Sequence, residues 1–171
     1  MVARPETRYR QKVRGLWPHW SCGYEPGFGS NDGYPDIQVL CPFTFKLVPI
    51  ELKVGSFKRN DPHIYVKEVR PSQVVWHHKF WKAHGRSAIM IGMEDLKGQW
   101  FSYAFSAEDL TGWREGFHPA NAIASFSQKN MERGIQEICD WCISRGPKEN
   151  GMVRSADISQ EGIRGPGVSI L

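Results

Sequence analysis

Two short stretches, residues 33–39 and 49–54, constrain this chain more than any other part of its sequence. Both alternate polar with apolar side chains at the two-residue period of a β-strand. Asp36 therefore lies on the polar face of the first strand, and Glu51 and Lys53 share the polar face of the second. If the two strands are neighbours, two carboxylates and one ammonium group project together. This pattern predicts a site for a metal ion and a phosphate group.

The order and spacing of these residues resemble the signature of the PD-(D/E)XK nucleases. Pro35-Asp36 is followed, fifteen positions after the Asp, by Glu51-Leu52-Lys53. Further along, Gln73 stands in a predicted helix, similar to the auxiliary Gln of the small phage-type VRR-NUC and Holliday-junction-resolvase-like branches. Each short pattern recurs by chance, but the ordered set is more specific.

The resemblance implies both a fold and an activity. The expected fold class is α/β, a restriction-endonuclease-like core with a central mixed sheet flanked by helices. The expected activity is that of a Mg²⁺-dependent deoxyribonuclease, an endonuclease that hydrolyses DNA phosphodiester bonds, with branched or flapped DNA as candidate substrates. Mn²⁺ can replace Mg²⁺ in this scheme. DNA is the expected partner, RNA is an open alternative, and a homodimer is a further expectation from the resemblance alone.

The resemblance also implies roles for individual residues. Asp36 and Glu51 would bind one or two metal ions, and the backbone carbonyl of Leu52 would be another ligand. Lys53 would offset negative charge in the transition state or orient the attacking water. Gln73 would hold the water or a phosphate oxygen through its amide.

A third carboxylate at the metal has two candidates. Glu6 opens a predicted basic helix over residues 5–16 and matches, in order, the first-helix Glu of the resembled family. An acid at that position is also favoured by the helix dipole alone. Glu25 ends a predicted strand over residues 17–25 and is the rival candidate. The sequence leaves this choice open.

Two other readings compete with the nuclease. The first is a nucleic-acid-binding or assembly protein on the same fold that does not cut, since fold alone does not establish activity. The second and weaker one is a zinc-stabilised module. Four cysteines could supply zinc ligands, although only one Cys-x-x-Cys pair is present and it lies in a predicted helix. The four are Cys22, Cys41, Cys139 and Cys142.

Composition and charge set the broad class. A chain of 171 residues is typical of one domain, expected over residues 1–145 with a tail or arm at 146–171. Residues 1–86 hold 14 Lys and Arg against 7 Asp and Glu, whereas the rest holds 8 against 11, so the half with the motif is basic and suits a polyanionic partner.

No run of apolar residues is long enough to span a membrane. The basic, polar first residues do not resemble a secretory signal, which predicts a cytoplasmic protein, in the host cytoplasm if the chain is viral.

Periodicity and turn residues predict the remaining elements. Residues 36–40 and 47–54 are expected to form an antiparallel pair. Further strands are expected at 86–93 and 100–105, with helices at 71–84 and 131–144, a loop at 55–68 and an irregular segment at 113–130. The spacing of Trp76, Phe80 and Ala83 predicts that they pack on the sheet, and Gln73 and His77, four residues apart, share a neighbouring face near the strands. The histidines of this helix are expected to be packing or surface residues.

Overall fold

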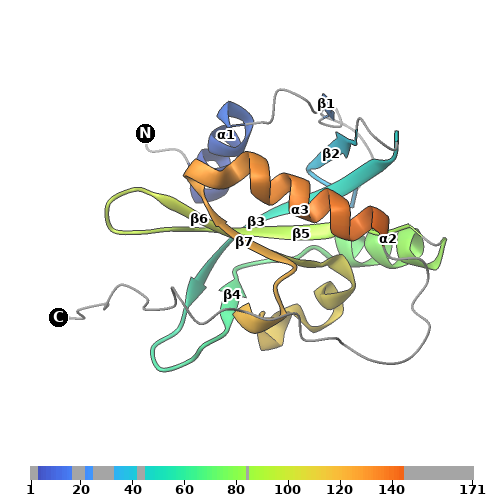
Figure 1. Ribbon diagram of the computed structural model, residues 1–171. Helices are drawn as coiled ribbons and strands as arrows, with labels where there is room; N and C mark the ends of the chain where they lie inside the picture. Colours follow the sequence, from blue (N-terminus) through green and yellow to red (C-terminus); the bar gives the residue numbers. More distant parts are fainter. Residues whose placement is uncertain (1–3, 17–21, 25–32, 42–44, 84, 145–171) are drawn as a thin grey trace.

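The computed structural model describes residues 4–16, 22–24, 33–41, 45–83 and 85–144. The strands are β1 (Cys22–Tyr24), β2 (Ile37–Leu40), β3 (Leu47–Phe57), β4 (Ile64–Val66), β5 (Ala88–Glu94), β6 (Trp100–Ser106) and β7 (Ala124–Ser127). The helices are α1 (Pro5–Gly15), α2 (Pro71–Lys82) and α3 (Met131–Ser144), with 3₁₀ segments η1 (Ala107–Glu115), η2 (Pro119–Asn121) and η3 (Gln128–Asn130). The α/β class is therefore confirmed, with a mixed, open central sheet and flanking helices (Figure 1).

The sheet is built around β3. Its six-stranded path runs β1-β2-β3-β5-β6-β7, and β4 pairs with β3 outside this path. β2 and β3 are antiparallel, as predicted, with Ile37 opposite Ile50, whereas β3 and β5 are parallel, with Glu51 beside Ile89. Pro49 fits near the start of β3 because pairing with β5 begins only at the next residue.

Apolar side chains cover both faces of the sheet. On one face, α1 and α3 pack over a core that includes Val39, Ile50 and Met90. On the other face, η1 and β4 pack over a second core that includes Ile89 and Ile91. Because strand side chains alternate between faces, Glu51 and Lys53 project on the second face, the one that α2 approaches.

α1 is held on the sheet by one aromatic side chain. Tyr9 is fully buried, stacks on Trp100 with ring centroids 4.9 Å apart, and shares a 2.8 Å hydrogen bond with the hydroxyl of Ser102. Its ring lies directly over Gly92, where an added Cβ would come within 2.3 Å of the ring. A glycine in β5 therefore allows α1 to approach the sheet closely.

Two sequence predictions are wrong in part. The expected loop at 55–68 is a hairpin, because β3 continues to Phe57 and pairs with β4, whose Ile64 and Val66 are buried in the second core. The expected irregular segment at 113–130 contains β7, which pairs with β6 and buries Ala124. Both missed strands have only three or four residues, so neither shows a clear period in the sequence.

The helices agree closely with the predicted ranges. α1 and α2 end one and two residues before the predicted limits, and α3 has the predicted bounds. Of the strand predicted at 17–25 the described part is β1, and the predicted tail at 146–171 lies outside the described residues. Among the described helices, none combines the length and apolar character that a membrane span requires.

The close approach of α1 yields a first prediction. Gly92→Ala should lower the free energy of unfolding by about 1–3 kcal/mol, because the new methyl group would overlap the buried Tyr9 ring. Thermal unfolding monitored by circular dichroism measures the change. The matched control is Gly15→Ala, where nothing lies within 4 Å of the added Cβ. Equal melting temperatures for the two variants would contradict this packing.

Candidate functional site

The two carboxyl groups that the sequence pattern singled out meet between β2 and β3. Asp36 immediately precedes β2, and Glu51 lies in β3. The Asp36 carboxyl accepts a 2.9 Å hydrogen bond at Oδ2 from the backbone N–H of Leu52, and it lies near enough to Glu51 for the charge of Glu51 to raise the pKa of Asp36. The register of two neighbouring strands thus brings the two acids together.

A tight backbone contact places Asp36 beside α2. Gly33 has a φ of +102°, which favours glycine, and a Cβ at this position would lie 2.3 Å from the carbonyl oxygen of Ser72. The segment that leads into Asp36 therefore packs directly on the first turn of α2. This contact draws Asp36 and the start of that helix into one site.

Gln73 connects the helix to the strand. Its Oε1 accepts hydrogen bonds from Lys53 Nζ at 3.1 Å and from the backbone N–H of Arg70 at 3.0 Å, while its Nε2 donates to Glu51 Oε1. Lys53 Nζ also lies 3.1 Å from Glu51 Oε1. Glu51, Gln73 and Lys53 are all buried, with at most 7% of each exposed. The structure thus brings together all four residues that the sequence nominated as catalytic.

The buried face of α2 carries Gln73 and His77, as predicted, and the aromatic stripe beside it is less buried than predicted. Gln73 and His77 are the buried residues of the helix, whereas Trp76 and Phe80 are half-buried and Ala83 is exposed. The prediction that the aromatic stripe packs on the sheet is therefore wrong. The physical reason is that the polar groups of Glu51 and Lys53 require hydrogen-bond partners, which an aromatic face cannot supply.

His77 is a site residue that sequence reasoning undervalued. Its Nδ1 lies 2.7 Å from the Ser87 hydroxyl, and its Nε2 lies 3.9 Å from Glu51 Oε2. Both His77 Nε2 and Glu51 Oε2 are buried without a hydrogen-bond partner. Burial lowers the pKa of His77 to about 4, so the ring is neutral at physiological pH. Its four-residue spacing from Gln73 correctly predicted that it lies on the helix face near the strands, but no sequence signal indicated its approach to Glu51.

The carboxyl pair carries an electrostatic cost. Burial, with the neighbouring charge of Glu51, raises the pKa of Asp36 to about 6, although Arg10 and the Leu52 N–H favour the ionised form. Burial also raises the pKa of Glu51, which Lys53 partly opposes. The pair therefore retains a proton well above the pH at which a free carboxyl group ionises.

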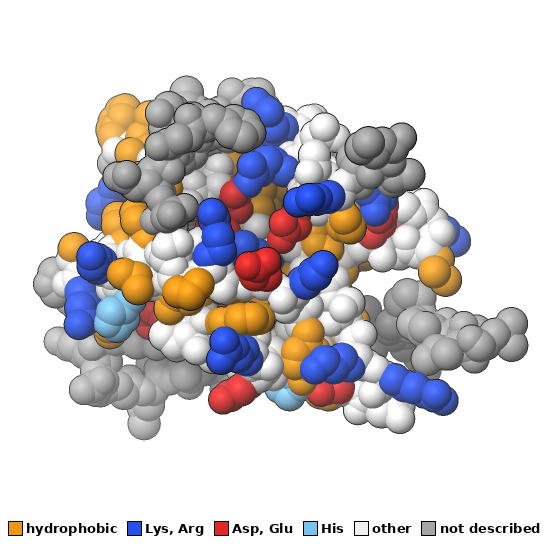
Figure 2. All heavy atoms as spheres, turned by 180° about the vertical axis from the view of Figure 1, so that it is seen from behind, with side chains coloured by type: hydrophobic (Ala, Val, Ile, Leu, Met, Phe, Trp, Pro, Cys, Tyr) orange, Lys and Arg blue, Asp and Glu red, His pale blue; other side chains and the backbone are white. Residues whose placement is uncertain are grey.

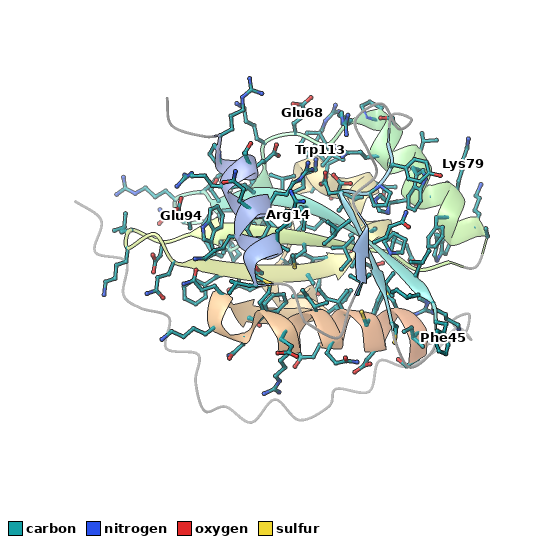
Figure 3. All side chains as sticks on the ribbon, turned by 90° about the horizontal axis from the view of Figure 1, so that it is seen from above. Arg14, Phe45, Glu68, Lys79, Glu94 and Trp113 are labelled. Atoms are coloured by element: carbon teal, nitrogen blue, oxygen red, sulfur yellow. The ribbon has the colours of Figure 1, made fainter. Side chains whose placement is uncertain are left out.

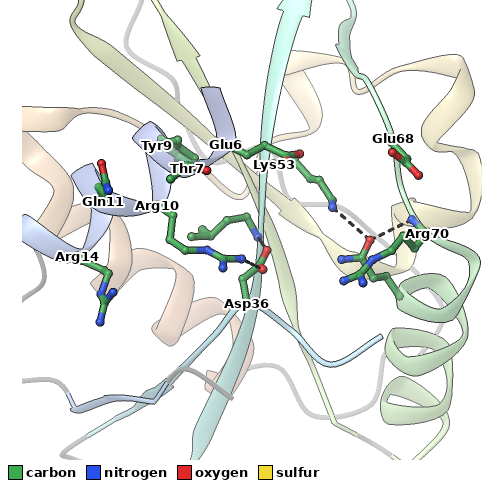
Figure 4. A pocket seen from close by; sticks show the side chains of 12 residues that line it. Glu6, Thr7, Tyr9, Arg10, Gln11, Arg14, Asp36, Lys53, Glu68 and Arg70 are labelled. Carbon is green, nitrogen blue, oxygen red and sulfur yellow. Dashed lines mark hydrogen bonds and ion pairs between the residues drawn. The ribbon is translucent and has the colours of Figure 1, made fainter. Parts of the chain in front are cut away.

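Asp36 opens onto a cavity of about 530 Å³ between α1 and α2. Arg10 reaches across from α1 to form an ion pair with Asp36, a contact that the sequence did not predict beyond a basic helix face (Figure 4). Acidic side chains with Lys and Arg around them mark this face of the molecule in Figure 2. The lining residues are Glu6, Thr7, Tyr9, Arg10, Gln11, Arg14, Asp36, Leu52, Lys53, Glu68, Arg70 and Gln73.

Of the two candidates for a third carboxylate, the structure describes only Glu6. Glu6 lines the same cavity as Asp36 and is exposed to solvent, so it lies within the site that the sequence assigned to it. Glu25 lies outside the described residues. Glu51 does not line the cavity, because it is fully buried behind its neighbours.

The donor set fits a hard divalent cation. Burial raises the pKa of both Asp36 and Glu51, so a divalent cation would offset the cost of ionising them together, and Glu51 Oε2 is buried without a hydrogen-bond partner. Within the described residues, no cluster of three or more His, Cys, Asp and Glu side chains is arranged to hold a metal. Two carboxylates are sufficient for Mg²⁺, which keeps several of its waters when bound.

The cysteines give the zinc hypothesis no support. Cys139 and Cys142 lie on α3, burial raises the pKa of each thiol to about 12, and among the described residues no third His, Cys, Asp or Glu completes a zinc-binding cluster with them. The side chain of Cys22 lies outside the described part of the chain.

No protein-family model and no curated protein matches this sequence.

The raised pKa of Asp36 predicts a pH-dependent gain in stability for Asp36→Asn. The folded protein holds this proton up to about pH 6 and the unfolded chain only to about its ordinary value of 3.8, so Asp36 lowers stability as pH rises through that window. In EDTA at pH 7.5, Asp36→Asn should melt several degrees above the wild type, which corresponds to a gain of at most about 3 kcal/mol in the free energy of unfolding. Near pH 4 the two proteins should melt at the same temperature.

The melting-temperature difference between Asp36→Asn and the wild type, followed across pH, isolates the effect of the Asp36 carboxyl group. His77 acts in the opposite sense, because its lowered pKa removes stability as pH falls from 6.5 towards 4. The charge of Asp36 opposes this lowering of the His77 pKa, so Asp36→Asn should make the loss at low pH slightly larger in the variant. Asp140→Asn, on the exposed face of α3, changes the net charge equally and is the control. A melting-temperature difference that does not change with pH would contradict the assigned carboxyl pair.

Proposed function

We propose that this protein is a metal-dependent endonuclease of the PD-(D/E)XK class that hydrolyses DNA phosphodiester bonds on a restriction-endonuclease-like core. The observation that carries the proposal is the convergence of Asp36, Glu51, Lys53 and Gln73 from three separate elements. A surface ion-pair cluster would not be buried in this way. Buried charged groups are costly, and an arrangement that retains them is typical of a site with a chemical task.

Each group has a role in phosphodiester hydrolysis. A divalent cation bound by Asp36 and Glu51 would polarise a phosphoryl oxygen and lower the pKa of a bound water. Lys53 is held 3.1 Å from Glu51 Oε1, so its ammonium group is placed to offset the negative charge that develops on the phosphate. Gln73 fixes the Glu51 carboxylate through its Nε2 and keeps Lys53 in place through its Oε1.

The cavity favours a phosphate backbone as ligand. Arg10, Arg14 and Arg70 line it together with Lys53, and they come from both sides of the carboxyl pair. Guanidinium groups bind phosphate oxygens in a bidentate manner, and each neutralised phosphate releases counterions. Positive charge on both sides of an acidic centre suits a polyanion whose scissile phosphate reaches that centre through a metal ion.

Cleavage of a panel of labelled DNAs tests the proposal. The panel comprises linear duplex, single strand, nicked, flapped and four-way DNA, each with Mg²⁺, Mn²⁺ or EDTA. We expect metal-dependent cleavage by the wild type and a rate at least about a hundredfold lower for Lys53→Met, which removes the charge but keeps the side-chain length. Lys129→Met, on the exposed η3, should cut at the wild-type rate.

Three results would count against the proposal. They are cleavage in EDTA, wild-type cleavage by a folded Lys53→Met protein, and no cleavage of any substrate. Thermal unfolding of each variant establishes that it is folded. Salt-sensitive DNA binding without cleavage under any condition would instead support a non-catalytic nucleic-acid-binding protein on the same fold.

A further inference from the structure

A column of aromatic rings rises from α2 beside the carboxyl pair. Trp76 stacks on Phe80 with ring centroids 5.0 Å apart and an interplanar angle of 13°. Tyr34 rests on Trp76 at a centroid distance of 5.6 Å. These three rings, Tyr34, Trp76 and Phe80, are called the aromatic column below. Trp76 also meets the ring of His77 edge to face, with centroids 4.9 Å apart, so the column adjoins the buried site.

The outer ring of the aromatic column is exposed and stands next to the site. Tyr34 is 41% exposed and lies two residues before Asp36, a separation of about 7 Å along extended chain. The neighbouring Gly33 packs on Ser72, and Trp76 supports the ring from below. An exposed ring held in a fixed position at the edge of the site is a preorganised surface for a flat ligand.

The surroundings of the aromatic column favour an anionic ligand. α2 contains no Asp or Glu, and its exposed Lys79 and Lys82 lie in the last turn. Lys79 projects outward from this helix in Figure 3, and Trp81, 45% exposed, adds another ring to the same helix. Figure 2 shows hydrophobic side chains interleaved with Lys and His on the side of the molecule that carries α2. Aromatic rings interleaved with cations are what single-stranded nucleic acid binds.

We propose that Tyr34 is a base-stacking platform for an unpaired nucleotide next to the scissile phosphate. The inference rests on the proposed nuclease function and deepens it, because it selects nucleic acid with an unpaired base at the cleavage position. In a continuous duplex both faces of each base are covered by its neighbours, so none is available to the Tyr34 ring. A base at a flap, a branch or a single strand has a free face that can stack on it.

The test measures binding separately from cleavage. Fluorescence anisotropy in EDTA, at one fixed salt concentration, gives the affinity of the full chain for a labelled single strand and for a blunt duplex of the same length. Tyr34→Ala should weaken single-strand binding by about five- to hundredfold, the effect of losing one base–aromatic stack. Its affinity for the blunt duplex should change less than twofold.

Two further variants separate stacking from folding. Tyr34→Phe keeps the ring and loses only the hydroxyl, so it should bind the single strand as the wild type does. Phe101→Ala removes an aromatic ring of nearly equal exposure, 43%, from β6, and should leave both affinities unchanged. Thermal unfolding establishes that all three variants are folded.

The possible results lead to distinct conclusions. Selective single-strand loss in Tyr34→Ala with no metal-dependent cleavage by the wild type would support the platform and reject the nuclease. If the wild type cleaves DNA with metal, but Tyr34→Ala binds single strand and duplex with unchanged or equally reduced affinities, the platform is rejected and the nuclease proposal stands. A dimer in light scattering that Tyr34→Ala dissociates would show that the aromatic column contacts a second copy of the chain, which also overturns the inference.

Discussion

Burial of the Glu51 carboxylate beneath α2 is the constraint that organises this structure. A buried carboxylate needs partners, and here they are the ammonium group of Lys53 on the same strand and the amide of Gln73 on the helix. Gln73 also accepts the backbone N–H of Arg70, so the same side chain caps the helix and connects it to the sheet. The position of α2 and the electrostatics of the site are therefore set by one hydrogen-bond network.

This network contributes little to stability by itself. Removing two carboxyl groups from water is costly, and the raised pKa values of Asp36 and Glu51 are the direct sign of that cost. The two apolar cores on either face of the sheet supply the compensating free energy. Sites that stabilise a reaction commonly weaken the fold that holds them, and this carboxyl pair has that character.

Close backbone approaches bring the elements around the site within reach of one another. Gly92 lets α1 settle on β5, which carries Arg10 to Asp36, and Gly33 lets the chain before Asp36 touch the start of α2. Because α2 turns Gln73 and His77 towards the strands, Trp76 and Phe80 are only half-buried and Trp81 is exposed. The orientation of α2 thus links the catalytic proposal, which uses Gln73, to the base-stacking proposal, which uses Trp76.

The sequence by itself determined the strand pair, the helices and the four residues of the proposed catalytic centre. The strand pair and the helices rest on local properties, and alternation with a period of two assigns Asp36, Glu51 and Lys53 to polar faces whatever the rest of the chain does. The catalytic roles of these residues, and the choice of Gln73, rest instead on the resemblance to the PD-(D/E)XK nucleases. The two missed strands, β4 and β7, are too short for such a pattern and form because longer neighbours offer unpaired edges. The sequence therefore predicted helices and strands correctly where a periodic segment was long, and missed strands of three or four residues.

Only the tertiary structure decided that the aromatic stripe of α2 is not its buried face, that His77 approaches Glu51, and that Arg10 pairs with Asp36. An apolar stripe such as Trp76 and Phe80 ordinarily faces a core, so local reasoning placed it inside. The buried charges of β3 reversed that preference, and those charges come from residues about twenty positions away in the chain. Such long-range electrostatic demands have no local signature, which is why the sequence could nominate the site but not its surroundings.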